Sequence, residues 1–514
     1  MNGEASPLLS GRSPSITLRS DDSSYYGSRD PRASFAWLLP AAVMFSLASE
    51  LSNVSRALLM SQYVCEESQL NCTIRSFPVA IAAIFTTCLF SSLSTPFWSL
   101  EGEIRGRRYA LIVATLGTAF VNILFAVIST GSRFEGPAPI LIMGGLALEG
   151  LLGGTATFRA ALNAYAADVA PAGTWSTSFS VLQGVFVVCS VLGSSIGFGL
   201  NLFGPFLGFA VGAGVAAINL VYLVFFLPES LPEEFELDRP SKLQLSDFKS
   251  SISSMFAALS GDRMALLVLA FFLYSLTLSA NFIRHPFALS QTDTASSIPF
   301  VVTSYLSEML AFFALFPGIV YILKRRTPLS MAISTKHYLA SVTTIDVSAS
   351  RLFAFTDLAN QLLVLLVSAS PSLAFFFVAL MVPLTSGLKP AFQALIAAFS
   401  ESRTTRSRRG VLFGAISVVE LIGQTFSHVI YRLTSRHGVS PKAGFGVTAA
   451  LLGVVAVILS LWPASPRSGP GDLPRDHERI RIVVSEAPAE QNADATLSPV
   501  YRRHGVVEGS TETL

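Results

Sequence analysis

Apolar stretches of about 20 residues or more follow one another from residue 35 to residue 462. A helix needs about 20 apolar residues to cross a bilayer core of about 30 Å. These stretches also lack the polar face that a surface helix of a soluble protein carries. Charged residues make up only 13% of the chain, against about 25% in soluble domains. The sequence therefore predicts an all-α membrane protein and excludes a large soluble enzyme.

The predicted spans number twelve and form two groups of six. They lie at 35–59, 77–99, 109–130, 138–165, 176–201 and 204–228, then at 264–285, 298–323, 352–370, 372–398, 410–432 and 443–462. The chain is accordingly divided into a disordered tail at 1–33, a first six-helix bundle at 34–228, a middle loop at 229–263, a second six-helix bundle at 264–462 and a disordered tail at 463–514. Within the middle loop, Asp247 to Leu259 fits either an amphipathic helix on the membrane surface or a flexible linker.

Basic residues set the expected orientation. With the N-terminus in the cytoplasm, three inner loops hold clusters of Lys and Arg, and the outer loops hold scattered ones. The clusters are Arg105, Arg107 and Arg108; Lys324, Arg325, Arg326 and Lys336; and Arg403, Arg406, Arg408 and Arg409. Both termini are therefore predicted to be cytoplasmic, as an even number of spans requires.

This orientation places the loop from Ser61 to Ser76 outside the cytoplasm. Cys65 and Cys72 could form a disulfide there or remain two free thiols. Asn71 begins an Asn-Cys-Thr glycosylation acceptor on the same side.

No motif in the chain indicates a soluble cofactor or catalytic chemistry. We find no nucleotide-binding loop, dinucleotide fingerprint, nucleophile elbow or metal-ligand spacing, and no basic face suited to nucleic acid. We therefore expect no cofactor, no metal and no enzymatic activity.

The chemistry to explain is the set of charges inside the apolar spans. A charge at the bilayer centre costs several kcal/mol, about +2.5 to +3.5 on insertion scales, unless it has a partner or water. The set comprises Glu50, Glu149, Arg159, Glu308, Lys389 and Glu420. Two interpretations remain open. Either the charges line a polar cavity in which Glu149, Glu308 or Glu420 exchanges a proton, or they form fixed interhelical ion pairs.

The loop after the second span resembles a signature of the major facilitator superfamily. That family has Gly-x-Leu-x-Asp-Arg-x-Gly-Arg-Arg where this chain reads Ser99-Leu-Glu-Gly-Glu103-Ile104-Arg-Gly-Arg-Arg108. The acidic position and the final Gly-Arg-Arg match, whereas Ser99 and Ile104 depart from the pattern. The segment Ala164-Tyr-Ala-Ala-Asp168 is also similar to drug and solute carriers, and Gly387-Leu-Lys-Pro-Ala391 is similar to fungal carriers related to proton-coupled folate and haem transporters.

The resemblance implies a fold of two six-helix bundles that rock around a central site. It implies a cavity lined by Glu50, Arg159, Asn163, Asn281 and Lys389, and a cytoplasmic gate of Glu103, Gly106, Arg107, Arg108 and Asp168. The segment Leu192 to Gly197 is similar to an antiporter motif but has Ser194 in place of its Pro.

We expect a secondary active transporter of a small organic molecule that works as a monomer in the bilayer with protons as coupling ion. The Phe-rich spans favour export of a drug-like compound or secondary metabolite. An alternative is a proton-coupled importer of an anionic or heterocyclic nutrient, bound by Arg159 and Lys389. An alternative of another class is a transport-inactive sensor on the same fold. The default location is the plasma membrane, and the acidic dileucine-like segment Glu4 to Leu9 would direct the protein to a vacuole or lysosome.

Overall fold

A computed structural model describes most of the chain between residues 33 and 462. The described ranges are 33–64, 69–130, 138–171, 173–231, 245–260, 262–278, 294–326, 335–367, 387–403, 409–436 and 441–462. Almost all of these residues are helical, as the apolar stretches predict.

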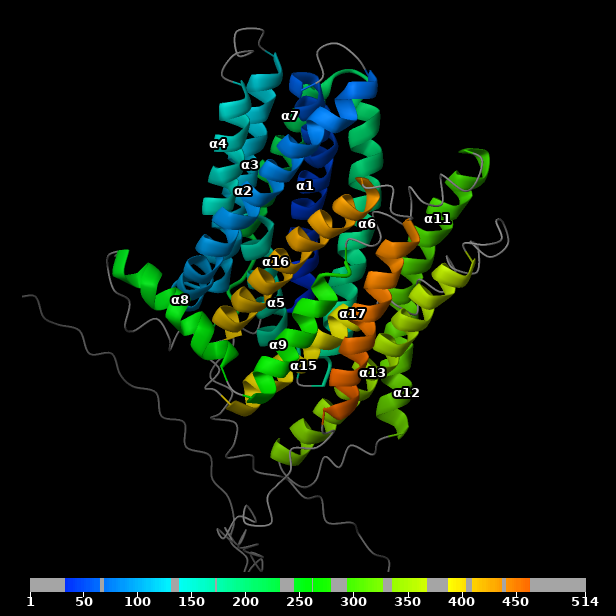
Figure 1. The fold of residues 1–514 in the computed structure, drawn as a ribbon. Helices are drawn as coiled ribbons and strands as arrows, with labels where there is room; N and C mark the ends of the chain where they lie inside the picture. Colours follow the sequence, from blue (N-terminus) through cyan, green and yellow to red (C-terminus); the bar gives the residue numbers. More distant parts are fainter. Residues whose placement is uncertain are drawn as a thin grey trace, which may run out of the picture. The chain divides into compact units, whose positions relative to one another are not determined.

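The first half of the fold contains seven helices that cover the first six predicted spans (Figure 1). They are α1 (Phe35–Val64), α2 (Gln69–Ile104), α3 (Arg107–Thr130), α4 (Ala138–Leu151), α5 (Gly154–Val169), α6 (Trp175–Asn201) and α7 (Pro205–Phe225). Helix α1 packs against α6 and α7, and α3 packs against α5 and α7. Helices α4 and α5 share the fourth span, which breaks between them.

The described helices of the second half cover parts of the remaining predicted spans. Its elements are α9 (Asp262–Ser275), α11 (Thr294–Leu310), the π-helix η4 (Ala311–Leu315), α12 (Phe316–Arg326), α13 (Thr335–Val367), α15 (Leu388–Arg403), α16 (Arg409–Arg436) and α17 (Pro441–Leu461). Helix α13 packs against α15 and α17, and α9 packs against α16 and α17. Helices α2, α5 and α6 of the first half contact α15, α16 and the α11–α12 region of the second.

Within the described residues, nine helical segments are long and apolar enough to cross a membrane. A tenth is possible if the bent pair Phe248–Leu259 and Met264–Ser275 forms one span. The predicted spans at 264–285 and 372–398 are described only in part. The number twelve therefore stays a prediction, while the multi-pass helical architecture is confirmed.

Two predicted boundaries differ from the structure. Most of the loop expected at Ser61–Ser76 is helical, because α1 continues to Val64 and α2 begins at Gln69. Asn71 and Cys72 lie in the first turn of α2, and Cys65 lies outside the described residues. The ninth span begins earlier than expected, since α13 starts at Thr335 rather than near residue 352.

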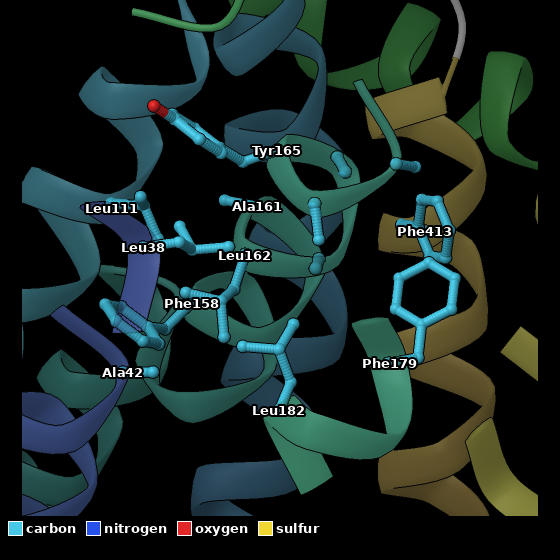
Figure 2. Close-up of a cluster of buried hydrophobic side chains, with 14 of the residues drawn as sticks. Leu38, Ala42, Leu111, Phe158, Ala161, Leu162, Tyr165, Phe179, Leu182 and Phe413 are labelled. Atoms are coloured by element: carbon cyan, nitrogen blue, oxygen red, sulfur yellow. The ribbon is translucent and has the colours of Figure 1, made fainter. Parts of the chain in front are cut away.

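The largest buried cluster is centred on α5 (Figure 2). Phe158 stacks on Phe45 of α1 with ring centroids 3.6 Å apart. On the other side of α5, Phe179 of α6 contacts Phe413 of α16, with centroids 5.6 Å apart. The cluster thus includes side chains of both halves and fixes α5 between α1 and α16.

The middle segment contains a real helix, α8 (Leu245–Leu259), rather than a flexible linker. Figure 1 shows α8 at an angle to the other helices, and it packs against α2 and α16. Met255 is buried with Val411 and Val418 of α16, and Leu100 of α2 packs on the same cluster. Helix α8 therefore contacts both halves at once.

Candidate functional site

A cavity of about 430 Å³ lies between the two halves. Its walls come from α1, the α4–α5 region and α6 of the first half, and from α9, α11, η4, α13, α15 and α16 of the second. Phe45, Phe186 and Phe312 give it apolar surfaces. The volume falls in the range of small-molecule sites, about 300–1,000 Å³.

Charged side chains from several helices also reach this cavity. The carboxylates in its walls are Glu50, Glu149, Glu308 and Asp357, and the cations are Arg56, Arg159 and Lys389. Such a concentration of ionisable groups within membrane-spanning helices is expected only where they have partners or contact water.

Three of the predicted residues meet in what we name the cavity ion cluster: Arg159, Lys389 and Glu420. Lys389 Nζ donates to Glu420 Oε1 at 2.7 Å, and Arg159 Nη1 lies 3.5 Å from the same oxygen. Gln424 Nε2 donates to that oxygen as well, at 3.2 Å. Arg159 belongs to the first half and the other two residues to the second, so one carboxylate joins cations of both halves.

Arg159 keeps access to the cavity despite this pairing. Its side chain is 34% exposed, against 11% for Lys389 and 8% for Glu420. The guanidinium lies over the Phe186 ring, 5.1 Å from its centroid, a geometry suited to a cation–π contact. A ligand in the cavity would therefore meet Arg159 first.

Glu149 is held by a residue that the sequence did not single out. Arg56 of α1 donates Nη1 and Nη2 to its two carboxylate oxygens at 2.8 and 3.1 Å. This bidentate arrangement is the strong form of the Arg–carboxylate pair. Arg56 also lies over Phe125, so the pair is fixed in place.

The fourth span breaks between Glu149 and Arg159. Gly153 has φ 92° and Gly154 has φ 50°, which few residues other than Gly adopt. Two side chains of α2 bind carbonyls at the break: Ser94 Oγ donates to Gly150 O at 2.6 Å, and Trp98 Nε1 donates to Leu151 O at 2.8 Å. The break is therefore satisfied by protein groups, as an irregular segment at membrane depth requires.

A second charged group, the interhalf ion cluster, comprises Glu103, Arg107, Asp168 and Arg409. Arg107 is 1% exposed, and its Nε donates to Asp168 Oδ2 at 3.0 Å. Arg409 of α16 donates Nη1 to Ala167 O at 2.8 Å and lies 3.4 Å from Asp168 Oδ1. Asp168 therefore binds one cation of each half, as Glu420 does in the cavity.

Two carboxylates cap helices at this end of the fold. Glu103 Oε1 accepts from Val411 N at 3.0 Å, near the start of α16. Glu229 accepts from Arg107 N and Arg108 N, at the start of α3, at 2.8 and 3.1 Å. The first N–H groups of a helix lack intrahelical partners and carry partial positive charge. Glu103 thus joins α2 to the opposite half.

Glycines allow the helices around the interhalf ion cluster to approach closely. Gly106 has φ 104°, and a Cβ there would lie 2.3 Å from Glu229 Oε2. A Cβ on Gly410 would lie 1.9 Å from Arg107 Nη1, and one on Gly414 would lie 2.3 Å from Ser99 Oγ. Ser99, which replaces the Gly of the family signature, is therefore accommodated by a Gly on the facing helix.

Helix α6 adds three hydrogen bonds to the second half. Ser176 donates to Asp346 Oδ1 at 2.9 Å, and Ser180 donates to the backbone O of Phe312 at 2.7 Å. Gln183 Nε2 donates to Gln393 Oε1 at 3.4 Å. The donors are spaced along one face of α6, so this face forms part of the contact between halves.

The predicted site residues fall into three groups. Glu50, Arg159, Lys389, Glu149 and Glu308 line the cavity, and Glu420 pairs with two of the cations there. Asn163 is buried in α5 and is not among the lining residues. Asn281 lies outside the described residues, as do the side chains of Asn71 and Cys72.

All five predicted gate residues lie together. Glu103, Arg107 and Asp168 belong to the interhalf ion cluster, Gly106 fits against Glu229, and Arg108 Nη1 donates to Leu227 O at 3.2 Å. Sequence reasoning missed Arg56, Glu229 and Arg409. In the sequence, Arg409 is part of a basic loop cluster, and Glu229 is the first residue of the predicted middle loop, so neither indicated a contact between the halves.

Solved structures of membrane transporters have a fold similar to that of this chain. The human organic anion transporter MFSD10 superposes with a TM-score of 0.58 at 16% identity, over 83% of this chain and 99% of that one. The E. coli fucose:proton symporter FucP gives 0.54 at 13% identity, over 83% and 97%, and is a major facilitator superfamily transporter. An outward-facing bacterial homologue of the iron transporter ferroportin gives 0.54 at 13%, over 83% and 98%.

Among curated proteins, one relative is the lysosomal proton-coupled steroid conjugate and bile acid symporter SLC46A3 of Gallus gallus, 26% identical over 179 residues. The match spans 34% of this chain and 38% of that relative. No protein-family model matches the chain. The matched proteins are transporters and not enzymes. The chain is therefore a multi-pass membrane protein with the major facilitator fold.

Proposed function

We propose that this chain is a proton-coupled secondary transporter of small organic molecules that carry an anionic group. The observation that carries the proposal is the cavity ion cluster, in which Glu420 is shared by Lys389 and Arg159. A proton on Glu420 removes the charge that holds both cations, and an anionic group of the substrate takes its place. Proton and substrate are then bound together, which is the requirement for symport.

The geometry favours symport over the export expected from the Phe-rich spans. An exporter driven by antiport needs the proton and the substrate to exclude each other. Here a proton on Glu420 frees Arg159 and Lys389 for an anion, so the two ligands assist each other. The proteins of similar fold or sequence include an organic anion transporter and proton symporters, which supports both parts of the proposal.

Alternating access is proposed to work through the interhalf ion cluster. The contacts of Asp168 with Arg409 and of Glu103 with Val411 close the end of the fold where α2 meets α3. The basic loops predict that this end is cytoplasmic. In this proposal the structure is an outward-facing state, and its inward-facing counterpart forms when these contacts separate.

The test is transport in proteoliposomes with an imposed pH gradient. A panel of organic anions is added, and labelled substrate and internal pH are both followed. We expect uptake that depends on the proton gradient. In Glu420→Gln, which mimics the protonated acid, we expect loss of proton coupling with substrate exchange retained.

The control is Glu101→Gln, a carboxylate paired with Arg105 outside the cavity, which should keep its coupling. If no compound moves with protons, or if Glu420→Gln keeps normal coupling, the proposal is wrong. The sensor alternative would be supported by binding without any movement of substrate.

A further inference from the structure

The cavity carries a feature that the proton-coupled mechanism does not use: a polar stripe along α1. Ser46, Ser49, Glu50, Asn53 and Arg56 all line the cavity. Their spacing of three, four, seven and ten residues from Ser46 places them on one face of the helix. The stripe lies on the first half, whereas Lys389 and Glu420 lie on the second.

Two serine hydroxyls of the stripe are buried without hydrogen-bond partners among the described residues. Ser46 is 6% exposed, and neither its Oγ nor that of Ser49 has a hydrogen-bond partner among the described residues. Burying a hydroxyl without a hydrogen-bond partner is unfavourable. Both are therefore placed to receive hydrogen bonds from, or donate them to, a molecule in the cavity.

Glu50 differs from Glu149 and from the three cations of the cavity. Arg56 is paired with Glu149, and Arg159 and Lys389 are paired with Glu420. Glu50 has no ion pair among the described residues, and its one hydrogen bond comes from Asn53 Nδ2 at 3.3 Å. Close packing sets its position, since a Cβ on Gly193 of α6 would lie 2.7 Å from the Glu50 Cβ.

The charge balance decides which ligand group suits this stripe. With Glu420 protonated, as in the substrate-bound state proposed above, the four carboxylates that line the cavity outnumber its three cations by one. A substrate with only negative charge would add to this excess, whereas an ammonium group would reduce it. An ammonium group is also a triple donor, and it matches the Glu50 carboxylate and the two serine hydroxyls.

We propose that the α1 stripe is a second subsite that binds an ammonium group, and that the substrate is a zwitterion. Its anionic group binds Arg159 and Lys389, its ammonium group binds Glu50, Ser46 and Ser49, and its apolar body lies against Phe45, Phe186 and Phe312. This inference rests on the function proposed above and adds the class of substrate.

The test measures binding of three matched probes to the full chain in lipid nanodiscs by calorimetry. They are 4-(aminomethyl)benzoate, which is a zwitterion, 4-methylbenzoate, which has only the acid, and 4-methylbenzylamine, which has only the amine. A two-ring series of the same three types covers a longer separation of charges. We expect the zwitterion of at least one series to bind about tenfold or more tightly than its acid, the effect of one hydrogen bond to a charged group.

Glu50→Gln should reduce the zwitterion to the affinity of the acid and leave the acid unchanged. Ser46→Ala with Ser49→Ala should reduce the advantage of the zwitterion about threefold. Glu101→Gln serves as the control and should change nothing. Equal binding of acid and zwitterion, an advantage that survives Glu50→Gln, or no binding by either series would overturn the proposal.

The competing explanation for the role of Glu50 is that it binds a proton rather than an ammonium group. The pH dependence of binding distinguishes these two explanations. If Glu50 holds a proton instead of an ammonium group, the acid alone gains affinity as the pH falls, and Glu50→Gln removes that gain. That result would also overturn the proposal. Failure of the proposed transport function would appear in a different measurement, as proton coupling that persists in Glu420→Gln or as no compound moving with protons, and does not depend on the ratio of zwitterion to acid.

Discussion

At the residue scale, substitutions in the family signature are balanced by neighbours that are distant in sequence. Ser99 stands where the signature has Gly, and Gly414 of α16 provides the space for it. Ile104 stands where the signature has Arg, and Arg409 supplies a cation from the other half. The family resemblance, from the signature and the segment Ala164 to Asp168, placed Glu103, Arg107 and Asp168 in one group. It could not identify Gly414 or Arg409, because their roles arise only from the packing of α2 and α5 on α16.

Asp168→Asn tests the interhalf ion cluster. The substitution leaves the buried Arg409 without its carboxylate and leaves Arg107 with Glu103 alone, at 3.9 Å, and removing one partner of a buried pair costs about 3–5 kcal/mol. We expect a clearly lower thermal unfolding temperature of the purified protein. The measurement is thermal unfolding in a fixed detergent, at one protein concentration.

Arg105→Gln is the matched control. Arg105 lies close to Arg107 in the chain and pairs with Glu101, but its side chain is 32% exposed. The partner Glu101 is buried, at 7% exposed, but Arg105 itself remains in contact with solvent, so this variant should lose less stability than Asp168→Asn, whose partners are both nearly fully buried. Equal stability of the two variants would contradict the importance assigned to Asp168.

At the scale of elements, the apolar pattern predicted where the helices lie but not how they break. The pattern predicts one span at 138–165, and Gly150, Gly153 and Gly154 lie within it. In the structure the span divides into α4 and α5. A Gly-rich run permits either outcome. The break depends on Ser94 and Trp98 of α2, which bind the freed carbonyls, and such partners become visible only in the folded state.

Gly153→Ala tests the break. The residue has φ 92°, where a side chain costs roughly 1–2 kcal/mol, and a Cβ would lie 2.3 Å from Thr157 Oγ1. We expect lower thermal stability and weaker anion binding, because the turn orients α5 and hence Arg159. Both effects can be measured on one purified sample.

Gly144→Ala, in helix α4 of the same span, is the control. Nothing lies within 4 Å of a Cβ at Gly144, and Ala is favoured over Gly in a helix by about 1 kcal/mol. This variant should be as stable as the wild type or more so. If Gly153→Ala behaves in the same way, the break is not a structural requirement.

At the scale of the whole molecule, the expectation of a multi-pass helical protein with the major facilitator fold is confirmed, while the division into two groups of six spans and the location in the cell stay predictions. The segment Glu4 to Leu9 has the form of an acidic dileucine signal. We expect a fluorescent fusion of the full chain to reside in a lysosome or vacuole.

Replacing Leu8 and Leu9 together by Ala should shift the fusion to the plasma membrane, as scored by microscopy with a surface-labelling assay. Leu18→Ala, in the same tail, is the control and should leave the location unchanged. Plasma-membrane residence of the unaltered fusion would contradict the signal.

Asp168 and Glu420 share a further property. Each binds one cation of its own half, Arg107 or Lys389, and one of the opposite half, Arg409 or Arg159. In the alternating-access cycle proposed above, each carboxylate keeps its local partner when the halves separate, and only the opposite guanidinium moves into water. No bare charge then remains in the apolar interior, where it would cost several kcal/mol. In this cycle, the local partner that each acid retains lowers the barrier between the outward-facing and inward-facing states. The same two acids restore the original alignment when the halves return.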